Sequence, residues 1–250
     1  MSGKYNTEGA PVETLSANEV ISCLWNKNST EKCRIGLADA VLYEYGLPAR
    51  WYMTGKTGEI LKKRGVDKVA LSQRWLRISS QNQSPFVAII RQESGILKFL
   101  TESAWYEFIE GDPIADNSLI SVHCFVKGSN NLAYRNRFEL KDRQGRFITS
   151  TDSYLFYDND GGDDNVKIMR ENQLKFTESK ATALKSIMDL ATNTVIRYLE
   201  RMLKVRVISL SVDYVIDTKS QLWMIWPGAA RIVRDAVLYD RPVTGLEEGE

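Results

Sequence analysis

The chain has 250 residues, of which 43% are hydrophobic and 26% are charged, a composition that excludes wholesale disorder and favours a globular core. Its 33 Lys and Arg residues nearly balance its 32 Asp and Glu residues, which leaves a net charge of +1. A dedicated nucleic-acid-binding protein usually has a basic excess, so we expect no nucleic acid among the partners. The length suits one large domain or two small ones.

The three cysteines are Cys23, Cys33 and Cys124, and they show no CxxC spacing. This usage indicates a reducing compartment. His123 is the only histidine, which leaves too few ligands for a structural zinc site. The first residues lack the basic and apolar segments of a signal peptide, and no apolar run reaches the about 18 residues of a membrane span. We therefore expect a soluble cytoplasmic protein with no membrane partner.

The N-terminal region is predicted to be helical after a flexible tail. Ser16 and Glu19 have the spacing of a capping box, in which each side chain accepts a hydrogen bond from the backbone N–H of the other residue. A second helix is predicted over residues 30–45, because its apolar residues recur at helical spacing and Gly46 follows it. These two helices are expected to pack as a helical hairpin.

Beyond residue 81 the pattern changes to strands with helices between them, so the predicted fold class is α+β. The three strands between residues 118 and 157 are expected to form an antiparallel meander. A long helix over residues 178–204 is expected to pack on that sheet through Leu184, Met188, Val195 and Leu199. A shorter helix is predicted at residues 101–110. The predicted strands are residues 86–91, 96–100, 118–126, 132–140, 146–157, 205–216 and 221–226.

The domain organisation follows from these elements. We predict a flexible tail, a helical N-terminal region, an α+β domain and an acidic tail, over residues 1–14, 15–80, 81–243 and 244–250.

Two motifs resemble ligand sites but lack a required residue. The run Thr54-Gly55-Lys56-Thr57 ends like a phosphate-binding loop, but Arg50 stands where that loop needs its first glycine, so we interpret it as a polar turn. The acidic run contains Asp158, Asp160, Asp163 and Asp164 but does not follow the ligand order of an EF-hand. It predicts a solvated acidic loop.

Side-chain alternation decides which neighbours share a face of a strand. His123 and Cys124 are adjacent, so they point to opposite faces and cannot act together as base and nucleophile. We interpret His123 as a packed strand residue. Arg135 and Arg137 share a face, where they can bind phosphate or carboxylate groups, or pair with acidic residues of neighbouring strands.

The C-terminal helix and strand pair resemble the last hairpin of the ATP-grasp fold, in particular that of tubulin-tyrosine-ligase-like enzymes. Asp213 matches the Asp of the first strand, Asp217 the turn and Trp223 the Trp of the second strand. The family places a Glu and an Asn for magnesium where this chain has Trp226 and Gly228. This hairpin is also similar to a non-catalytic module of flagellar and ciliary proteins of protists, which implies an axonemal, microtubule-associated role.

We therefore expect a degenerate ATP-grasp-like module that acts without catalysis or cofactor, as a structural subunit of a larger assembly. The resemblance implies tubulin or axonemal proteins as partners. Aromatic residues are the expected interface, since such residues anchor protein contacts. The candidates are Trp51, Tyr52, Trp75, Trp105, Tyr106, Trp223 and Trp226.

The alternative hypothesis is an ATP-grasp-type nucleotide-dependent ligase. It would use Asp213 as a metal ligand and Arg135 or Arg137 to bind phosphate. Under the first hypothesis Asp213 needs another partner, because a bare buried carboxylate is costly. We then expect it to pair with Arg135, Arg137 or Arg206, or to lie on a polar face of the sheet.

Overall fold

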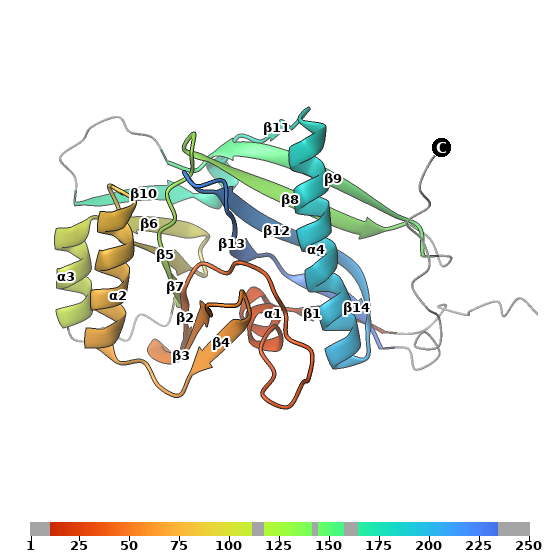
Figure 1. Cartoon of the computed structure of the whole chain (residues 1–250), viewed down its shortest axis with the longest axis horizontal. Coiled ribbons are helices and arrows are strands. Elements are labelled where there is room, and N and C mark those ends of the chain that lie inside the picture. The colour runs from red at the N-terminus through yellow and green to blue at the C-terminus, as the bar shows by residue number, and fades with distance from the viewer. Residues whose placement is uncertain (1–10, 112–117, 142–144, 158–164, 235–250) are drawn as a thin grey trace, which may run out of the picture.

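The computed structural model describes residues 11–111, 118–141, 145–157 and 165–234. These residues form two antiparallel sheets and four α-helices (Figure 1). The acidic run at residues 158–164, the acidic tail at 244–250 and residues 1–10 of the predicted flexible tail lie outside the described residues. Residues 12–14, which we predicted as part of that tail, belong instead to a strand.

The first sheet has seven strands in the order β1-β14-β12-β8-β9-β11, with β13 paired to β12. Helix α4, Thr182–Leu203, covers one face of this sheet (Figure 1). The strands are β1 Val12–Leu15, β8 Leu132–Leu140, β9 Phe147–Leu155, β11 Thr177–Glu178, β12 Arg206–Ile216, β13 Leu222–Pro227 and β14 Ala230–Val233.

The second sheet has seven strands in the order β10-β6-β5-β7-β2-β3-β4. Helices α2, Lys68–Gln81, and α3, Glu102–Glu110, lie together on the face turned away from the first sheet (Figure 1). The strands are β2 Ala40–Glu44, β3 Leu47–Thr54, β4 Ile60–Lys63, β5 Ala88–Gln92, β6 Ile96–Leu100, β7 Leu119–Cys124 and β10 Val166–Arg170. A 3₁₀ turn, Glu171–Gln173, follows β10.

Apolar side chains fill three layers of this arrangement. Met188, Val195 and Leu199 of α4 pack with the first sheet, and helix α1, Ala17–Cys23, joins this core through Val20 and Ile21. A second core lies between the second sheet and α2 and α3. A third lies between the two sheets, where aromatic rings contact one another. The inter-sheet aromatic residues are Phe86, Phe99, Phe125, Tyr154, Phe156 and Tyr157.

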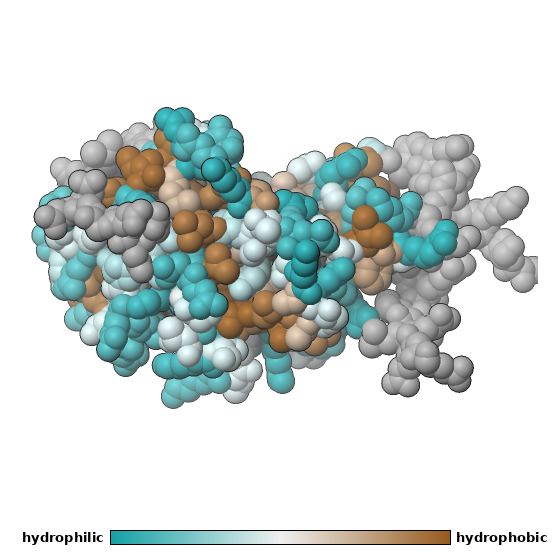
Figure 2. Space-filling view, turned by 90° about the horizontal axis from the view of Figure 1, so that it is seen from above, coloured by the Kyte–Doolittle hydropathy of each residue, from teal (hydrophilic) through white to brown (hydrophobic). Residues whose placement is uncertain are grey.

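Figure 2 shows the side of the molecule that carries β11 and the start of α4. Its visible coloured surface is not continuously apolar. Hydrophobic residues appear there as separate patches between hydrophilic ones. Leu190 and Ile187 of α4 are among the exposed apolar residues. None of the helices in the described ranges has the length and apolar character needed to cross a membrane.

Several predicted elements are confirmed. The capping box is present, with Ser16 N donating to Glu19 Oε2 at 2.7 Å and Glu19 N donating to Ser16 Oγ at 3.3 Å. The hairpin of β5 and β6 turns at Gly95, which has a φ of 73°. The long C-terminal helix packs on the first sheet through the predicted face, and β12 and β13 form the closing hairpin.

The predicted helical hairpin is not formed. Residues 40–44, which we assigned to its second helix, form β2, and they turn into β3 at Tyr45 and Gly46. Both faces of β2 are covered, one by α2 and α3 and the other by the first sheet, so its apolar residues run consecutively and do not alternate. A strand buried on both faces cannot be distinguished from a buried helix by periodicity. The region 15–80 thus holds two helices and three strands, and the wider division into domains stays a prediction.

The predicted meander is also wrong in one strand. Strand β7 pairs with β5 and β2 in the second sheet, whereas β8 and β9 pair in the first. The chain crosses between the sheets in the segment 125–131, which starts with the last two residues of the predicted strand 118–126 and ends just before the predicted strand 132–140. The consequence is that β7 and β8 bring side chains from opposite sides to the space between the sheets.

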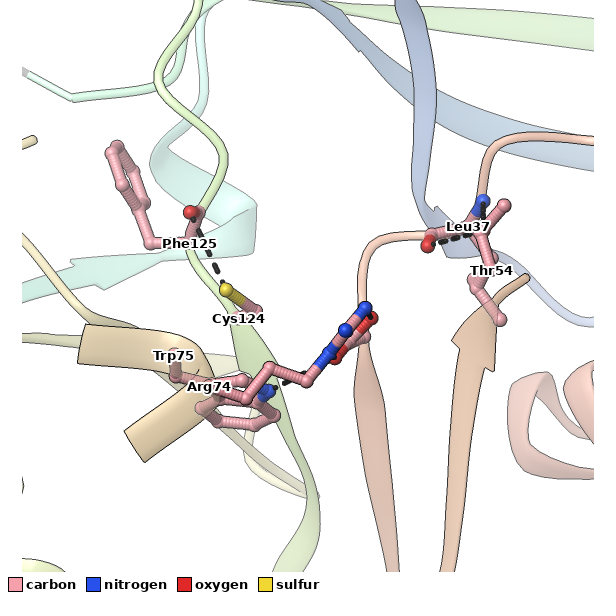
Figure 3. Close-up of polar contacts among 7 residues, drawn as sticks. Leu37, Thr54, Arg74, Trp75, Cys124 and Phe125 are labelled. Carbon is pink, nitrogen blue, oxygen red and sulfur yellow. Dashed lines mark hydrogen bonds and ion pairs between the residues drawn. The ribbon is translucent and has the colours of Figure 1, made fainter. Parts of the chain in front are cut away.

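A buried carboxylate anchors α2 to the second sheet. Asp39, just before β2, pairs with Arg74, and its Oδ2 also accepts a hydrogen bond from Trp75 Nε1 at 3.3 Å. Figure 3 shows Arg74 and Trp75 reaching from the helix toward this segment. Close by, Thr54 Oγ1 accepts from Leu37 N at 2.8 Å and donates to Leu37 O at 2.9 Å. These contacts fix the entry to β2.

Candidate functional site

The two faces of β8 have different roles, as the alternation predicted. Asn136 faces α4, where its Nδ2 donates to Asp189 Oδ1 at 2.7 Å. Arg135 and Arg137 face the other way, and Phe176 lies over both guanidinium groups at 4.9 and 5.2 Å from ring centroid to Cζ. That face of the first sheet is turned to the second sheet, so the two arginines lie at the edge of the space between the sheets.

Both arginines pair with carboxylates of neighbouring strands. Arg135 donates through Nε and Nη2 to the two oxygens of Asp213, at 2.7 and 2.8 Å, and Asp213 is its register partner on β12. Arg137 pairs with Asp152 on β9. The hydrogen bonds that Arg135 donates to Asp213 raise the pKa of Arg135, which therefore stays charged. The predicted pairing of Asp213 with a basic neighbour is confirmed.

The second sheet presents a row of three polar residues to the same space: Arg91 on β5, with Ser121 and His123 on β7. His123 Nε2 and Ser121 Oγ are 2.9 Å apart, and Arg91 Nη1 donates to Glu171 Oε1 at 2.6 Å. All three side chains are buried. Burial lowers the pKa of His123 well below its ordinary value, so its imidazole is neutral.

Trp226 of β13 connects this row to the first sheet. Its ring centroid lies 4.6 Å from Arg91 Cζ, and the His123 ring meets it edge-on at 5.0 Å. Tyr154 of β9 lies near the charges of Arg91, Arg135 and Asp213, and burial raises the pKa of its hydroxyl well above the ordinary value. We call these residues the junction cluster. Its members are Arg91, Ser121, His123, Arg135, Tyr154, Asp213 and Trp226.

Two nitrogen atoms of the junction cluster lack a hydrogen-bond partner. Arg91 Nε and His123 Nδ1 are both buried, and within the described residues neither has a protein acceptor or donor. A buried polar atom without a partner costs about 1–3 kcal/mol, and such atoms often mark the place of a ligand. The junction cluster is therefore the strongest candidate site.

The cluster suits anion binding better than nucleophilic catalysis. Cys124 points to the opposite face of β7 from His123, toward α2 and α3, and burial raises the pKa of its thiol well above the ordinary value. A protonated thiol and a neutral imidazole on opposite faces cannot form a nucleophile–base pair. Arg91 and Arg135, in contrast, carry planar sets of donors that match phosphate or carboxylate oxygens.

A magnesium site, which the ATP-grasp resemblance implies, does not fit the residues that the structure describes around Asp213. Both oxygens of Asp213 are bound by Arg135. Asp217 accepts from the backbone N–H groups of Lys219 and Gln221 and from Trp223 Nε1. Nowhere in the described part of the chain do three His, Cys, Asp or Glu side chains gather as a metal ion requires.

Most of the aromatic interface candidates lie inside the protein. Trp75 and Trp105 stack at 5.0 Å between α2 and α3, and Trp51 and Tyr52 are buried on β3. Trp226 belongs to the junction cluster, and Trp223 is half-buried against Asp217. Tyr106 is exposed.

The run Thr54–Thr57 is a polar turn between β3 and β4, as interpreted from the sequence, with Gly55 N donating to Glu59 O at 2.7 Å.

Our reasoning from the sequence missed Arg91, Ser121 and Glu171 as site residues. A signal for Arg91 was present in the sequence. It directly follows the apolar run 86–90, and an arginine at the end of a buried strand needs a partner.

No family model and no curated protein matches the chain. Among solved structures it is similar to D-alanyl-alanine synthetase A of Vibrio cholerae, with 11% identity over 78% of this chain and 50% of that one, at a TM-score of 0.43. It is also similar to N5-carboxyaminoimidazole synthetase of Staphylococcus aureus, with 10% identity over 78% of this chain and 40% of that one, at a TM-score of 0.40. A D-cycloserine synthetase shows 10% identity over 78% of this chain and 58% of that one, at a TM-score of 0.47.

The chain spans between 40% and 58% of the length of these three proteins. The likeness is distant, with identities of 10–11% and TM-scores of 0.40–0.47. The structures named above are synthetases, and none is an axonemal protein. This finding contradicts our expectation of a non-enzymatic structural subunit of a cilium, flagellum or microtubule, and the resemblance to axonemal proteins is not supported.

Proposed function

We propose that the chain is a nucleotide-dependent protein of the ligase type, which binds the phosphates of a nucleotide at the junction cluster. One observation carries the proposal: the guanidinium of Arg91 is buried between two sheets, yet its Nε has no acceptor among the described residues. A phosphate oxygen would supply that acceptor and form a charge-assisted hydrogen bond.

The two buried arginines differ in how firmly their counter-ions hold them. The partner of Arg135 is Asp213, which is itself buried and bound through two hydrogen bonds. The partner of Arg91 is Glu171, whose side chain is 37% exposed and which lies on a short 3₁₀ turn. An incoming phosphate can therefore replace the Glu171 carboxylate on Arg91 while the Glu171 side chain turns into solvent.

The surroundings also suit the other part of a nucleotide. Trp226 is buried with Arg91 over its ring, but Phe176 is only half-buried, and a nucleobase can stack on its remaining side at about 1–3 kcal/mol per base. Some of the similar synthetase structures are complexes with ADP. ADP is therefore the first probe.

We expect ADP at 100 times its dissociation constant to stabilise the full chain by about 2.7 kcal/mol. For a chain of this size that raises the melting temperature by about 5–11 °C in a thermal-shift assay. In Arg91→Met the shift should disappear, because methionine keeps the contact with Trp226 but offers no donor. Arg50→Met is the matched control, since Arg50 pairs with Glu44 at 2.7 Å on the far part of the second sheet.

Arg50→Met should keep the full shift. Circular dichroism of both variants without ligand would establish that they fold. Absence of a shift in the wild-type chain, or an unchanged shift in a folded Arg91→Met variant, would contradict the proposal.

The competition for Arg91 gives a second prediction. Glu171→Gln removes the competing carboxylate charge, so ADP should bind about two- to fivefold more tightly, in proportion to the about 0–1 kcal/mol that a partly exposed ion pair contributes. Isothermal titration calorimetry measures the change. Glu44→Gln, which removes the partner of Arg50, should leave the affinity unchanged. Weaker binding in Glu171→Gln would mean that Glu171 assists the ligand and does not compete with it.

A further inference from the structure

We infer that Arg135 occupies the place of a divalent cation on Asp213, so that nucleotide binding at the junction cluster needs no magnesium. The inference rests on the proposed function, because it concerns how the same site balances the charge of the phosphates. It departs from what the ATP-grasp resemblance implies, and the departure comes from the donor atoms of this chain.

The first argument is the geometry of the Arg135–Asp213 pair. Two parallel hydrogen bonds, at 2.7 and 2.8 Å, use both carboxylate oxygens. Asp213 is 2% exposed and both of its oxygens accept from Arg135, so a cation would have to displace the guanidinium to reach it. A small hard cation keeps several waters when it binds a carboxylate, and a buried bidentate ion pair leaves no room for them.

The second argument is the opposite strand. Trp226 is the register partner of Asp213 on β13 and contributes an indole ring in place of an oxygen ligand. Gly228 follows in the chain, and its N–H donates to Ser211 O at 2.7 Å. A Cβ built on Gly228 would lie 2.3 Å from Ser211 Oγ and 3.3 Å from Ser211 O. A side chain at this position would therefore force the Ser211 hydroxyl to turn away and crowd the backbone of β12.

The third argument is the charge that remains near the cluster. Arg91, Arg135 and Arg137 meet Glu171, Asp213 and Asp152 in three ion pairs. Glu171 and Arg137 are the half-exposed members, at 37% and 40%. When phosphates arrive, Arg91 and Arg137 can turn their donors to them, and Arg135 continues to neutralise Asp213. The three pairs are together neutral, so the phosphates gain the charge that a cation would supply only when Glu171 leaves Arg91 and Asp152 leaves Arg137.

The closing experiment measures ADP affinity by isothermal titration calorimetry twice, once with magnesium chloride and once with EDTA. We expect dissociation constants that agree within about twofold. Binding at least tenfold tighter with magnesium would overturn this inference and leave the proposed function standing. No binding in either medium would overturn the proposed function, and the claim about magnesium with it.

A second arm needs no nucleotide. Electron paramagnetic resonance of free Mn²⁺ is recorded during titration with the wild-type chain and with Asp213→Asn. We expect the two titrations to coincide, because Asp213 is not available to a cation. Capture of Mn²⁺ by the wild-type chain that is lost in Asp213→Asn would overturn the assignment of Arg135, whatever the result with ADP.

Discussion

Replacing Arg135 with methionine is expected to lower the free energy of unfolding by about 3–5 kcal/mol. The loss comes less from the attraction itself than from what remains, because Asp213 would be left 2% exposed with no cationic partner. Urea denaturation measures the effect as a lower midpoint with an unchanged m-value. It is the largest effect we expect from a polar substitution in this chain.

The double variant Arg135→Met/Asp213→Leu separates the two contributions. It removes both charges and leaves no bare carboxylate, so most of the lost stability should return. Arg234→Met is the control for a pair at the surface, since Arg234 and Glu13 are 2.9 Å apart but largely exposed, and it should change stability by about 1 kcal/mol or less. A single Arg135→Met variant as stable as the wild type would show that the pair is not holding β8 to β12.

Replacing Leu199 with alanine is expected to cost about 2–5 kcal/mol. Leu199 is 0% exposed on the face of α4 that packs on the first sheet, so the shorter side chain leaves a cavity between helix and strands. The melting temperature should fall by about 2–4 °C for each kcal/mol. Leu190→Ala on the same helix is the matched control, because Leu190 is 70% exposed and its truncation should cost about 0.5 kcal/mol or less. Equal losses in the two variants would contradict this account of the core.

The elements that could be predicted carry a signal within their own residues. Helix α4 has the first sheet on one side and solvent on the other, so its buried residues recur at helical spacing. The hairpin of β5 and β6 was found from the glycine at its turn, and α1 from its capping box. In each case the signal lies within a few neighbouring residues, which is the range over which a single sequence is informative.

Strand β2 and helix α2 show the opposite case. The apolar run in β2 is covered on both faces, which removes the alternation of a strand. Helix α2 carried a usable signal that we did not apply. Asp67 caps its first turn, accepting from Val69 N at 2.9 Å, and Leu71 and Trp75 are buried four residues apart. That pattern is typical of a helix with one packed face.

The candidate site was predicted only in part. Arg135 and Arg137 were placed on one face, and Asp213 was expected to have a basic partner, because alternation and the cost of a buried charge are local arguments. The contact of Arg91 and His123 with Trp226 depends on how two sheets pack. Residues 91 and 226 are far apart in the chain, and no pattern within either strand predicts their contact.

The pairing of β1 with β14 affects how the protein can be made. Val12 lies opposite Val233 and Leu15 opposite Ala230, so the first described strand pairs with the last described one. At about 5–20 residues per second, synthesis leaves β1 without its partner for roughly 10–40 s. During that time the backbone groups of β1 are open to any other unpaired strand on the ribosome or nearby. We expect the first sheet to close only after residues 230–233 have been made, and a chain cut before residue 230 to keep both β1 and the facing side of β12 open to aggregation.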